Sequence, residues 1–259
     1  MAVLRLWQGQ LEESRSYAER AYQRFRKLQD PFGIVQSLSP LVRVQVAQGR
    51  FAAAQRSAEE LAALAENGRN GPFPLLAAAG SAMHRGNGAT AAALAERAVE
   101  IMGANGAQAT EATTVLALAL AQQGRVDEAM IAVDTLGDAA LTHPFTGSVA
   151  AVVHALAHRS REAIDLADRV TMAEGATYLD EVFANIAAAA AHAQLDETDS
   201  ARSSAEAAVA RAIGVGDVVA TALAAGAFEA VTGQPHDGLD RSILGEGWQR
   251  VLSLLSTTR

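Results

Sequence analysis

The stretch AQQGRVDEAMIAVDTLGD, which runs from Ala121 to Asp138, decides the predicted fold. Gly124 stands between two alanine-rich apolar segments, and Ala129 follows five residues later. Glycine readily adopts the left-handed backbone conformation that ends many helices, and alanine places only a methyl group where two helices approach. The stretch therefore predicts a helix, a tight turn, and a second helix that packs back on the first.

Six further copies of this turn are spread along the chain, each with a turn residue followed five residues later by a residue that we call the anchor. The turn and anchor residues are Gly9 and Ser14, Gly49 and Ala54, Gly86 and Ala91, His158 and Ala163, Asp196 and Ala201, and Gly233 and Gly238. From Ser14 onward, with Ala129 in its place, successive anchors stand 40, 37, 38, 34, 38 and 37 residues apart. A repeat of this length is typical of a helical solenoid.

Apolar residues recur with helical periodicity along nearly the whole chain, and no convincing alternating pattern predicts a strand. Turn-forming residues separate the helical segments. The sequence therefore predicts an all-α fold, with helices near 10–28, 33–48, 51–67, 74–85, 88–103, 107–122, 126–138, 145–157, 160–173, 178–194, 198–214, 217–231 and 240–255.

The composition of the 259 residues fits this prediction. Alanine makes up more than a fifth of the chain, aromatic residues make up 5%, and cysteine is absent. Small side chains let helices pack closely, and alanine favours helix formation. The lack of cysteine excludes disulfides and thiolate metal sites. No linker rich in serine and glycine interrupts the chain, so we predict a single repeat domain over residues 1–259.

The net charge is −8, which argues against a partner held by nucleic-acid phosphates. The N-terminus lacks the charged and then apolar pattern of a signal peptide, and no apolar run is long enough to span a bilayer. We therefore expect a soluble, cytoplasmic protein that binds neither nucleic acid nor a membrane.

Only eight residues precede Gly9, whereas a full helix precedes each of the other turns. Residues 1–8 thus predict the end of a helix in a truncated first repeat. Because an incomplete end repeat leaves an apolar face uncovered, we expect a chain excised from a longer protein or, less readily, one covered by a partner. Leu4, Leu6 and Trp7 would then promote self-association through the N-terminal repeat.

With these turns, the chain resembles the tetratricopeptide repeat (TPR) family, whose G-x-x-x-x-A turn matches GRVDEA and GRFAAA. The family's small helix residues resemble Ala117 and Ala189 in first helices, and Ala21, Ala98 and Ala208 in second helices. The chain departs from the pattern at His158 and Asp196, which replace the turn glycine, and it mostly lacks the closing proline. The resemblance implies a right-handed α-solenoid of about six to seven TPR-like helical hairpins.

The long spacing and the stretch LQDPFGIVQSL resemble the C-terminal arrays of bacterial signalling ATPases, nucleotide cyclases and transcription activators. In such proteins the array is a sensing or docking module. The resemblance therefore implies, by analogy, a role in a bacterial signalling or regulatory protein.

The candidate chemical motifs have structural interpretations. GNGAT, residues 86–90, is similar to a phosphate loop, but it follows a helix rather than a strand and coincides with a repeat turn. His154 and His158 could share a metal, yet His192 takes the equivalent position in the next repeat, which favours core histidines. The acidic stretches LDETD and YLDEV flank helix starts, where carboxylates favour the helix dipole. We predict no catalytic residue, metal site or cofactor.

In TPR arrays the first helix of each pair lines the concave surface, and the resemblance carries these positions onto the chain. The predicted partner-binding groove comprises Arg43, Phe73, Leu76, Met83, Glu111, Thr114, Leu118, Phe145, Val152, Phe183 and Ile186. The same projection includes Gln36, Ser39, Val46, Ser148 and Leu223. An apolar groove with one cation suits a partner helix, an apolar ligand or a preceding domain of the same protein. Alternatively, irregular repeats place these residues in the core between helices.

We therefore expect a non-enzymatic protein-interaction or regulatory module. The alternative is a small-molecule sensor that binds an apolar ligand in the cavity of the superhelix. An enclosed pocket with convergent polar groups would favour the sensor, and an open, continuous groove would favour protein docking.

Overall fold

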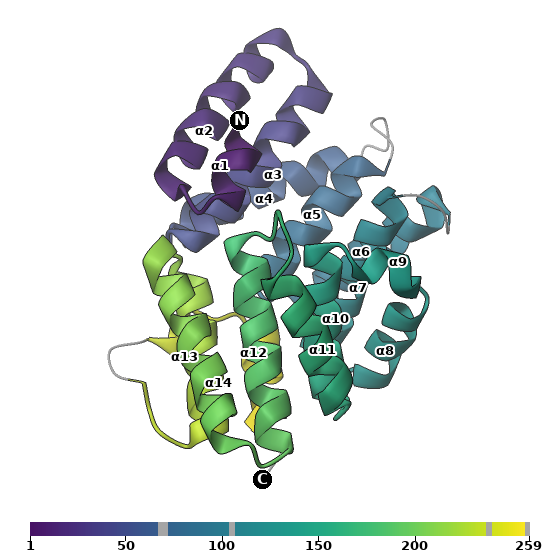
Figure 1. The fold of residues 1–259 in the computed structure, drawn as a ribbon. Coiled ribbons are helices and arrows are strands. Elements are labelled where there is room, and N and C mark those ends of the chain that lie inside the picture. The colour runs from purple at the N-terminus through teal and green to yellow at the C-terminus, as the bar shows by residue number, and fades with distance from the viewer. Residues whose placement is uncertain (67–71, 104–106, 237–239, 257–259) are drawn as a thin grey trace.

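A computed structural model of the chain describes residues 1–66, 72–103, 107–236 and 240–256. These residues form α-helices joined by short turns, with one 3₁₀ helix and no strand among them (Figure 1). The all-α prediction is confirmed. None of the described helices combines the length and the hydropathy that crossing a membrane requires.

The α-helices follow one another in a regular order along the chain. They are α1 Ala2–Trp7, α2 Leu11–Leu28, α3 Pro31–Ala47, α4 Phe51–Glu66, α5 Phe73–His84, α6 Gly88–Met102, α7 Ala107–Gln122, α8 Val126–Asp134, α9 Gly137–Leu141, α10 Pro144–Leu156, α11 Ser160–Thr171, α12 Tyr178–Gln194, α13 Thr198–Val215, α14 Val218–Thr232 and α15 Glu246–Ser256. The 3₁₀ helix η1 spans Arg241–Ile243. The predicted bounds agree with these within two residues for all but two helices.

The two exceptions have local causes. The helix predicted over 126–138 is divided into α8 and α9 because Gly137 takes a φ of +72° and interrupts the helical backbone. The helix predicted over 240–255 begins only at Glu246. Asp240 caps the short 3₁₀ helix by accepting from the Ser242 amide at 2.8 Å, and Leu244 is extended, with ψ 130°.

The repeated turns share one backbone geometry. All seven turn residues have positive φ, including the non-glycines His158 at +56° and Asp196 at +60°. At the six turns from Gly9 to Asp196, the amide of the turn residue donates to the carbonyl three residues earlier, and the next amide donates to the carbonyl five residues earlier. This pairing satisfies carbonyls that the end of a helix leaves without partners. The turn at Gly233 lacks it, because its amide donates to the carbonyl of Glu229.

The anchors lie in the helix–helix interior. Ser14, Ala54, Ala91, Ala129 and Ala163 have no exposed surface, and Ala201 is 2% exposed. Gly238, the last predicted anchor, lies outside the described residues. A small residue at each position thus lets the helix after the turn pack closely against its neighbours.

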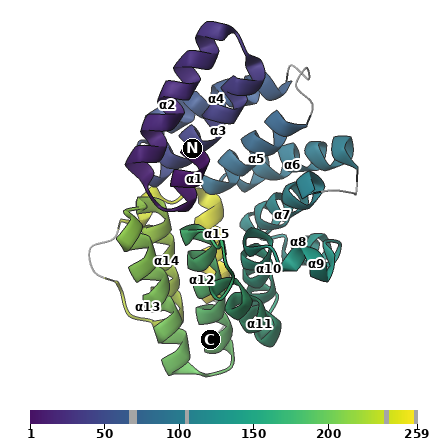
Figure 2. The same cartoon turned by 45° about the horizontal axis from the view of Figure 1, so that its top comes forward.

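Six helices form a closed series that we call the inner ring: α3, α5, α7, α10, α12 and α14. Each contacts the next in this order, and α14 returns to contact α3. Helices α4, α6, α8, α11 and α13 each pack between two successive helices of the ring (Figure 1). Helix α15 lies within the ring (Figure 2).

The first helix, α1, covers α2 and α3 through one side chain. Leu6 is buried, with 2% of its surface exposed, and belongs to a hydrophobic cluster with Leu11 and Val35. Leu4 and Trp7 are 46% and 48% exposed. The six residues of α1 therefore cover Leu6 and leave the other two large side chains partly in solvent.

Replacing Ala129 with leucine tests the packing at the anchors. Because Ala129 is fully buried, Ala129→Leu should overpack the contact and lower the free energy of unfolding by about 1–3 kcal/mol, measured by urea denaturation. Ala93→Leu on the exposed face of α6 is the matched control, and its effect should stay within about 0.5 kcal/mol. Equal midpoints for both variants would refute the assigned packing.

Candidate functional site

Helix α15 is an amphipathic helix seated on the inner ring, where it contacts α7, α10 and α14 (Figure 2). The apolar side chains recur at i, i+3, i+4 and i+7, which places them on one helix face. They are Trp248, Val251, Leu252 and Leu255, all 7% exposed or less. The exposed face carries Gln249, Arg250 and Ser253. The apolar face of α15 is therefore turned toward the ring.

Trp248 is the largest of these contacts. Its ring centroid lies 5.5 Å from that of Phe183 in α12, and its indole N–H donates to the carbonyl oxygen of His84 at 3.0 Å. A buried indole needs such an acceptor, since an unpaired N–H in the interior is unfavourable. Trp248 thus bridges the end of α5 and the start of α12 across the ring.

The backbone before Trp248 approaches the turn after α5 so closely that only glycine fits. The Gly247 amide donates to the Gly86 carbonyl oxygen at 2.8 Å. A Cβ atom would lie 2.6 Å from that oxygen at Gly247, and 2.1 Å from the Arg85 carbonyl oxygen at Gly245. Both distances are far below van der Waals contact. Further along, the guanidinium of Arg250 donates to the Gln123 carbonyl oxygen at 3.0 Å.

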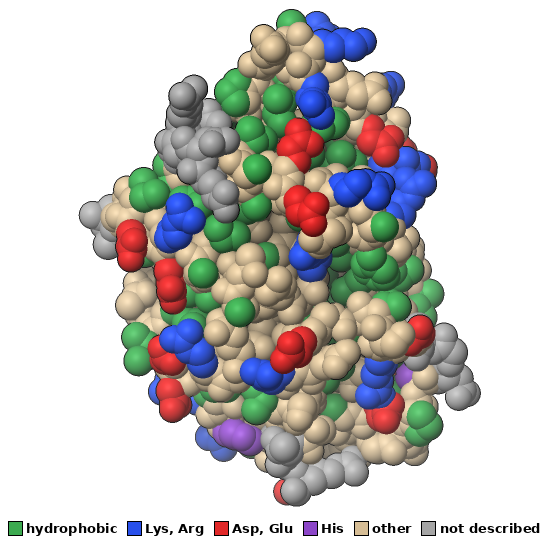
Figure 3. All heavy atoms as spheres, turned by 180° about the vertical axis from the view of Figure 1, so that it is seen from behind, with side chains coloured by type: hydrophobic (Ala, Val, Ile, Leu, Met, Phe, Trp, Pro, Cys, Tyr) green, Lys and Arg blue, Asp and Glu red, His purple; other side chains and the backbone are tan. Residues whose placement is uncertain are grey.

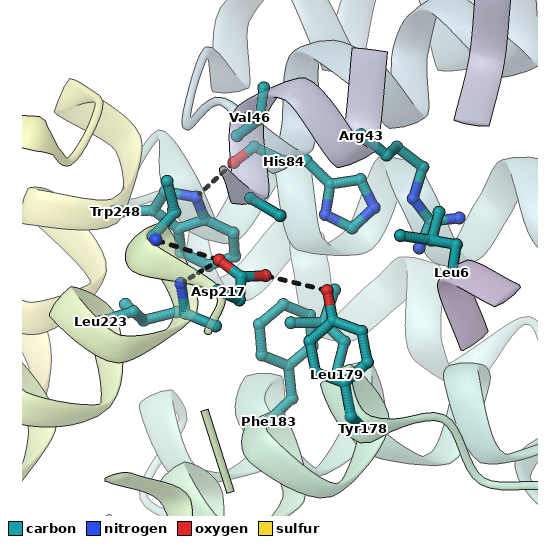
Figure 4. Close-up of a pocket in the computed structure, with 13 residues that line it drawn as sticks. Leu6, Arg43, Val46, His84, Tyr178, Leu179, Phe183, Asp217, Leu223 and Trp248 are labelled. Carbon is teal, nitrogen blue, oxygen red and sulfur yellow. Dashed lines mark hydrogen bonds between the residues drawn. The ribbon is translucent and has the colours of Figure 1, made fainter. Parts of the chain in front are cut away.

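A small cavity lies beside Trp248, between polar groups of the ring (Figure 4). Arg43, His84, Tyr178 and Asp217 contribute the polar side chains, and Leu6, Leu179, Phe183 and Leu223 contribute much of the apolar wall. The volume of about 30 Å³ matches that of one water molecule. Pockets for organic ligands have about 300–1,000 Å³, so this cavity is too small for one as it stands.

Asp217 joins two neighbouring ring helices. It caps α14 by accepting from the amides of Val219 at 3.0 Å and Ala220 at 2.9 Å, and it accepts from the Tyr178 hydroxyl of α12 at 2.9 Å. Burial raises the pKa of Asp217, and the three hydrogen bonds oppose that rise. Burial and the Asp217 charge hold the pKa of Tyr178 well above its ordinary value. The tyrosine therefore acts as a neutral hydrogen-bond donor.

Arg43 places a positive charge among these groups. Burial, with the Arg43 charge, holds the pKa of His84 well below its ordinary value, so the imidazole is neutral near pH 7. The same charge partly opposes the rise that burial causes in the pKa of Asp180 and of Asp217. Asp180 forms a capping box with Thr177 at the start of α12. The prediction that YLDEV flanks a helix start is confirmed.

The predicted groove residues fall into three groups. Leu76, Met83, Thr114, Leu118, Val152, Phe183 and Ile186 are buried; Arg43, Phe73 and Phe145 are half-buried; and Glu111 is exposed. Arg43, Phe183, Val46 and Leu223 line the cavity beside Trp248. The burial of Leu76, Phe183 and Ile186 fits the alternative prediction, which places such residues in the core between helices.

Sequence reasoning missed four residues of this site: His84, Tyr178, Asp217 and Trp248. Tyr178 and Asp217 stand 39 residues apart, close to the repeat length, at the starts of successive ring helices. Trp248 begins an i, i+3, i+4, i+7 pattern directly after glycine. Both signals are present in the sequence, but neither shows which helix the residues face.

The three histidines considered as metal ligands, His154, His158 and His192, have different surroundings. His154 is 8% exposed, and burial lowers its pKa. His158 forms a turn with positive φ, and the Nδ1 of His192 lies 2.5 Å from a carboxylate oxygen of Glu197. Within the described ranges, no three histidine or acidic side chains are grouped to hold a metal ion.

The face opposite to that of Figure 1 carries acidic and basic side chains interspersed with apolar ones (Figure 3). Positively and negatively charged side chains alternate over it, so the described part of this face presents no continuous patch of one charge. A field of one sign is what phosphate backbones or acidic partners require for electrostatic steering.

Removing the Tyr178 hydroxyl tests the link between α12 and α14. Because hydrogen bonds to charged groups contribute about 1.5–3 kcal/mol, Tyr178→Phe should lower the free energy of unfolding by that amount. Tyr17→Phe is the control, since the Tyr17 hydroxyl makes no hydrogen bond within the described part of the chain and its ring contact with Arg20 survives. Equal denaturation midpoints for the two variants would contradict the role of this bond.

The raised pKa of Asp217 predicts a pH effect on stability. A carboxyl whose pKa is higher in the folded chain binds protons first in that state, so its contribution to stability grows as pH falls through the raised value toward the usual 3.8. Asp217→Asn removes this contribution and keeps the capping oxygen. The free energy of unfolding of the parent minus that of the variant should therefore increase as pH falls in this window. A difference that is constant or decreases would contradict the raised pKa.

Comparison with known proteins gives no family assignment: no protein-family model matches the chain, and no curated protein matches its sequence.

Proposed function

We propose that the chain is a non-enzymatic protein-interaction module, a TPR-like right-handed α-solenoid of about six to seven hairpins, whose inner surface receives an amphipathic helix. The observation that carries the proposal is α15, which the inner ring already holds through one apolar face. By resemblance, the module belongs to a cytoplasmic bacterial signalling or regulatory protein.

Two recurring features support the repeat assignment. The first is the paired hydrogen-bond geometry that six turns share. The second is a glutamine two residues before the turn: Gln122 and Gln194 donate to the carbonyl oxygens of Met83 and Ala155, each 39 residues earlier. Both acceptors stand three residues before their own turn residue. Equivalent residues thus make equivalent contacts between successive units, as stacked repeats require.

The surface of α5, α12 and α14 that holds α15, which we call its seat, has the features of a helix-binding surface. It offers an aromatic neighbour and a carbonyl acceptor for Trp248, and Gly226 of α14 leaves room for the Leu252 side chain. A Cβ atom at Gly226 would lie 2.4 Å from the Leu252 Cδ1. Recognition of i, i+3, i+4 and i+7 anchors by a hydrophobic surface is a recurrent mode of peptide binding.

A small-molecule sensor is the second candidate, and the convergence of Arg43, His84 and Tyr178 on the cavity supports it. With Trp248 as one wall, however, the cavity holds about 30 Å³. A sensor would therefore need Trp248 to move before an apolar ligand could enter. Saturable binding of such a ligand with α15 still docked would favour the sensor over the interaction module.

Supplying the helix as a separate peptide tests the interaction module. Gly245→Ala with Gly247→Ala should undock α15, since both Cβ atoms would clash with backbone oxygens. A peptide of residues 240–256 should then bind this variant saturably in calorimetry. The same peptide with Trp248→Ala should bind at least about tenfold more weakly, because burying a large apolar side chain contributes about 1.5–3 kcal/mol. A folded variant that binds neither peptide would refute the proposal.

A further inference from the structure

We infer that α15 is a displaceable internal occupant of the inner ring, and that the partner is an amphipathic helix in which glycine directly precedes an aromatic anchor. This inference rests on the proposed function and adds the partner's pattern and a means of regulation. Three observations support it: the connector between α14 and α15, the hollows beside α15, and the contacts of α15 that require a particular residue type.

Helix α15 is not needed to close the ring. The contact between α14 and α3 completes the series of ring helices without it. Residues 233–245 connect it to α14, a length that reaches about 40 Å when extended. The described part of this connector includes η1, whose Arg241 forms a half-exposed ion pair with Glu229 of α14, and Leu244, which is buried against the core. Exposed ion pairs hold a segment only weakly. The connector is therefore long enough for α15, together with Leu244, to leave the ring while the ring stays closed.

Two hollows that are open to solvent adjoin α15. A hollow of about 340 Å³ lies at its N-terminal end, bordered by Gln122 and Glu246, and another of about 660 Å³ lies along its side, bordered by Glu229 and Leu252. The Gln122 side chain is 2% exposed, and its oxygen has no hydrogen-bond partner in the described structure. A buried acceptor without a donor is unfavourable. A different helix could fill more of this space and supply the missing donor.

The contacts of α15 define the partner's pattern. Gly247 must lack a side chain because its backbone meets Gly86, and the next residue must be aromatic to reach Phe183. Aliphatic residues follow three, four and seven positions after the aromatic one, as Val251, Leu252 and Leu255 do here. The pattern is thus glycine, aromatic, two variable residues, two aliphatic residues, two variable residues and one aliphatic residue.

Because α15 is tethered to the ring, it occupies the site on α7, α10 and α14 that a partner helix would bind. A helix on a short linker acts at a millimolar effective concentration, so an external helix must compete with it. The apparent affinity for a partner is the intrinsic affinity multiplied by the fraction of chains from which α15 has been released. Binding of a partner helix therefore requires release of α15, and docking of α15 excludes the partner.

The experiment follows α15 through its own fluorophore. Trp7 and Trp248 are the two tryptophans of the sequence, so Trp7→Phe leaves Trp248 as the single reporter. The probe is a peptide of residues 240–256 in which Trp248 is replaced by phenylalanine, which keeps the aromatic anchor but is dark at tryptophan wavelengths. It is titrated into the full Trp7→Phe chain, and into the same chain with Gly245→Ala and Gly247→Ala. Gly214→Ala is the matched control, because a Cβ atom there meets nothing within 4 Å.

Three results are expected. Saturating peptide should shift the Trp248 emission of the Trp7→Phe chain to the red as the indole leaves its buried seat. The variant with both alanines should show red-shifted emission before any peptide is added, and it should bind the peptide at least about tenfold more tightly because no tethered competitor remains. The Gly214→Ala chain should behave like the Trp7→Phe chain.

The results that would contradict the displacement of α15 can be told apart from those that would contradict the proposed function. If neither folded chain binds the peptide, the proposed function fails as well. If both chains bind with equal affinity, or if binding leaves the Trp248 emission unchanged, the helix-binding module stands and displacement of α15 is refuted. Loss of the helical circular-dichroism signal in the double-alanine variant would show that α15 is a fixed part of the fold. Dimerisation of that variant in sedimentation would assign the seat to a second copy instead of a different partner.

Discussion

The left-handed turn at the end of each inner helix is the constraint on which the other features depend. It reverses the chain within a few residues and, at the ends of all inner helices except α14, pairs carbonyls that the helix end would leave unsatisfied. Close reversal requires a small residue five positions later, and the buried anchors meet that requirement. The turns also hold free carbonyl oxygens at the ends of α5 and α7. His84, Gly86 and Gln123 present these oxygens to α15, so the geometry that builds the hairpins also forms part of the seat.

The polar groups inside the ring serve mainly to fix neighbouring helices. Asp180 and Asp217 are buried carboxylates, yet each caps a helix, and Tyr178 adds a bond between two successive ring helices. Burial raises the pKa of both acids, and the Arg43 charge opposes that effect. Such satisfied groups favour one arrangement of the helices over others, because any shift would leave a buried charge without its partners.

The contact between α15 and the ring links the two proposals. A surface that already holds a helix by its apolar face is suited to holding another of the same pattern. The open hollows beside Gln122 and Leu252 leave space for the proposed exchange of helices, in which the tethered α15 would compete with the partner. The proposed interaction and the proposed self-inhibition therefore rest on the same set of contacts.

The sequence alone determined the helices, their turns and the buried anchors, because these depend on interactions within about six residues and on the hydrophobic periodicity. Even the departures at His158 and Asp196 keep the turn conformation that the spacing predicts. Only the tertiary structure decided where the inner helices close on themselves and where α15 packs. Trp248 meets the carbonyl of His84 across 164 positions of sequence, and no local pattern encodes such a contact. The curvature accumulated over successive helix pairs brings these residues together, and that curvature is a property of the assembled packing.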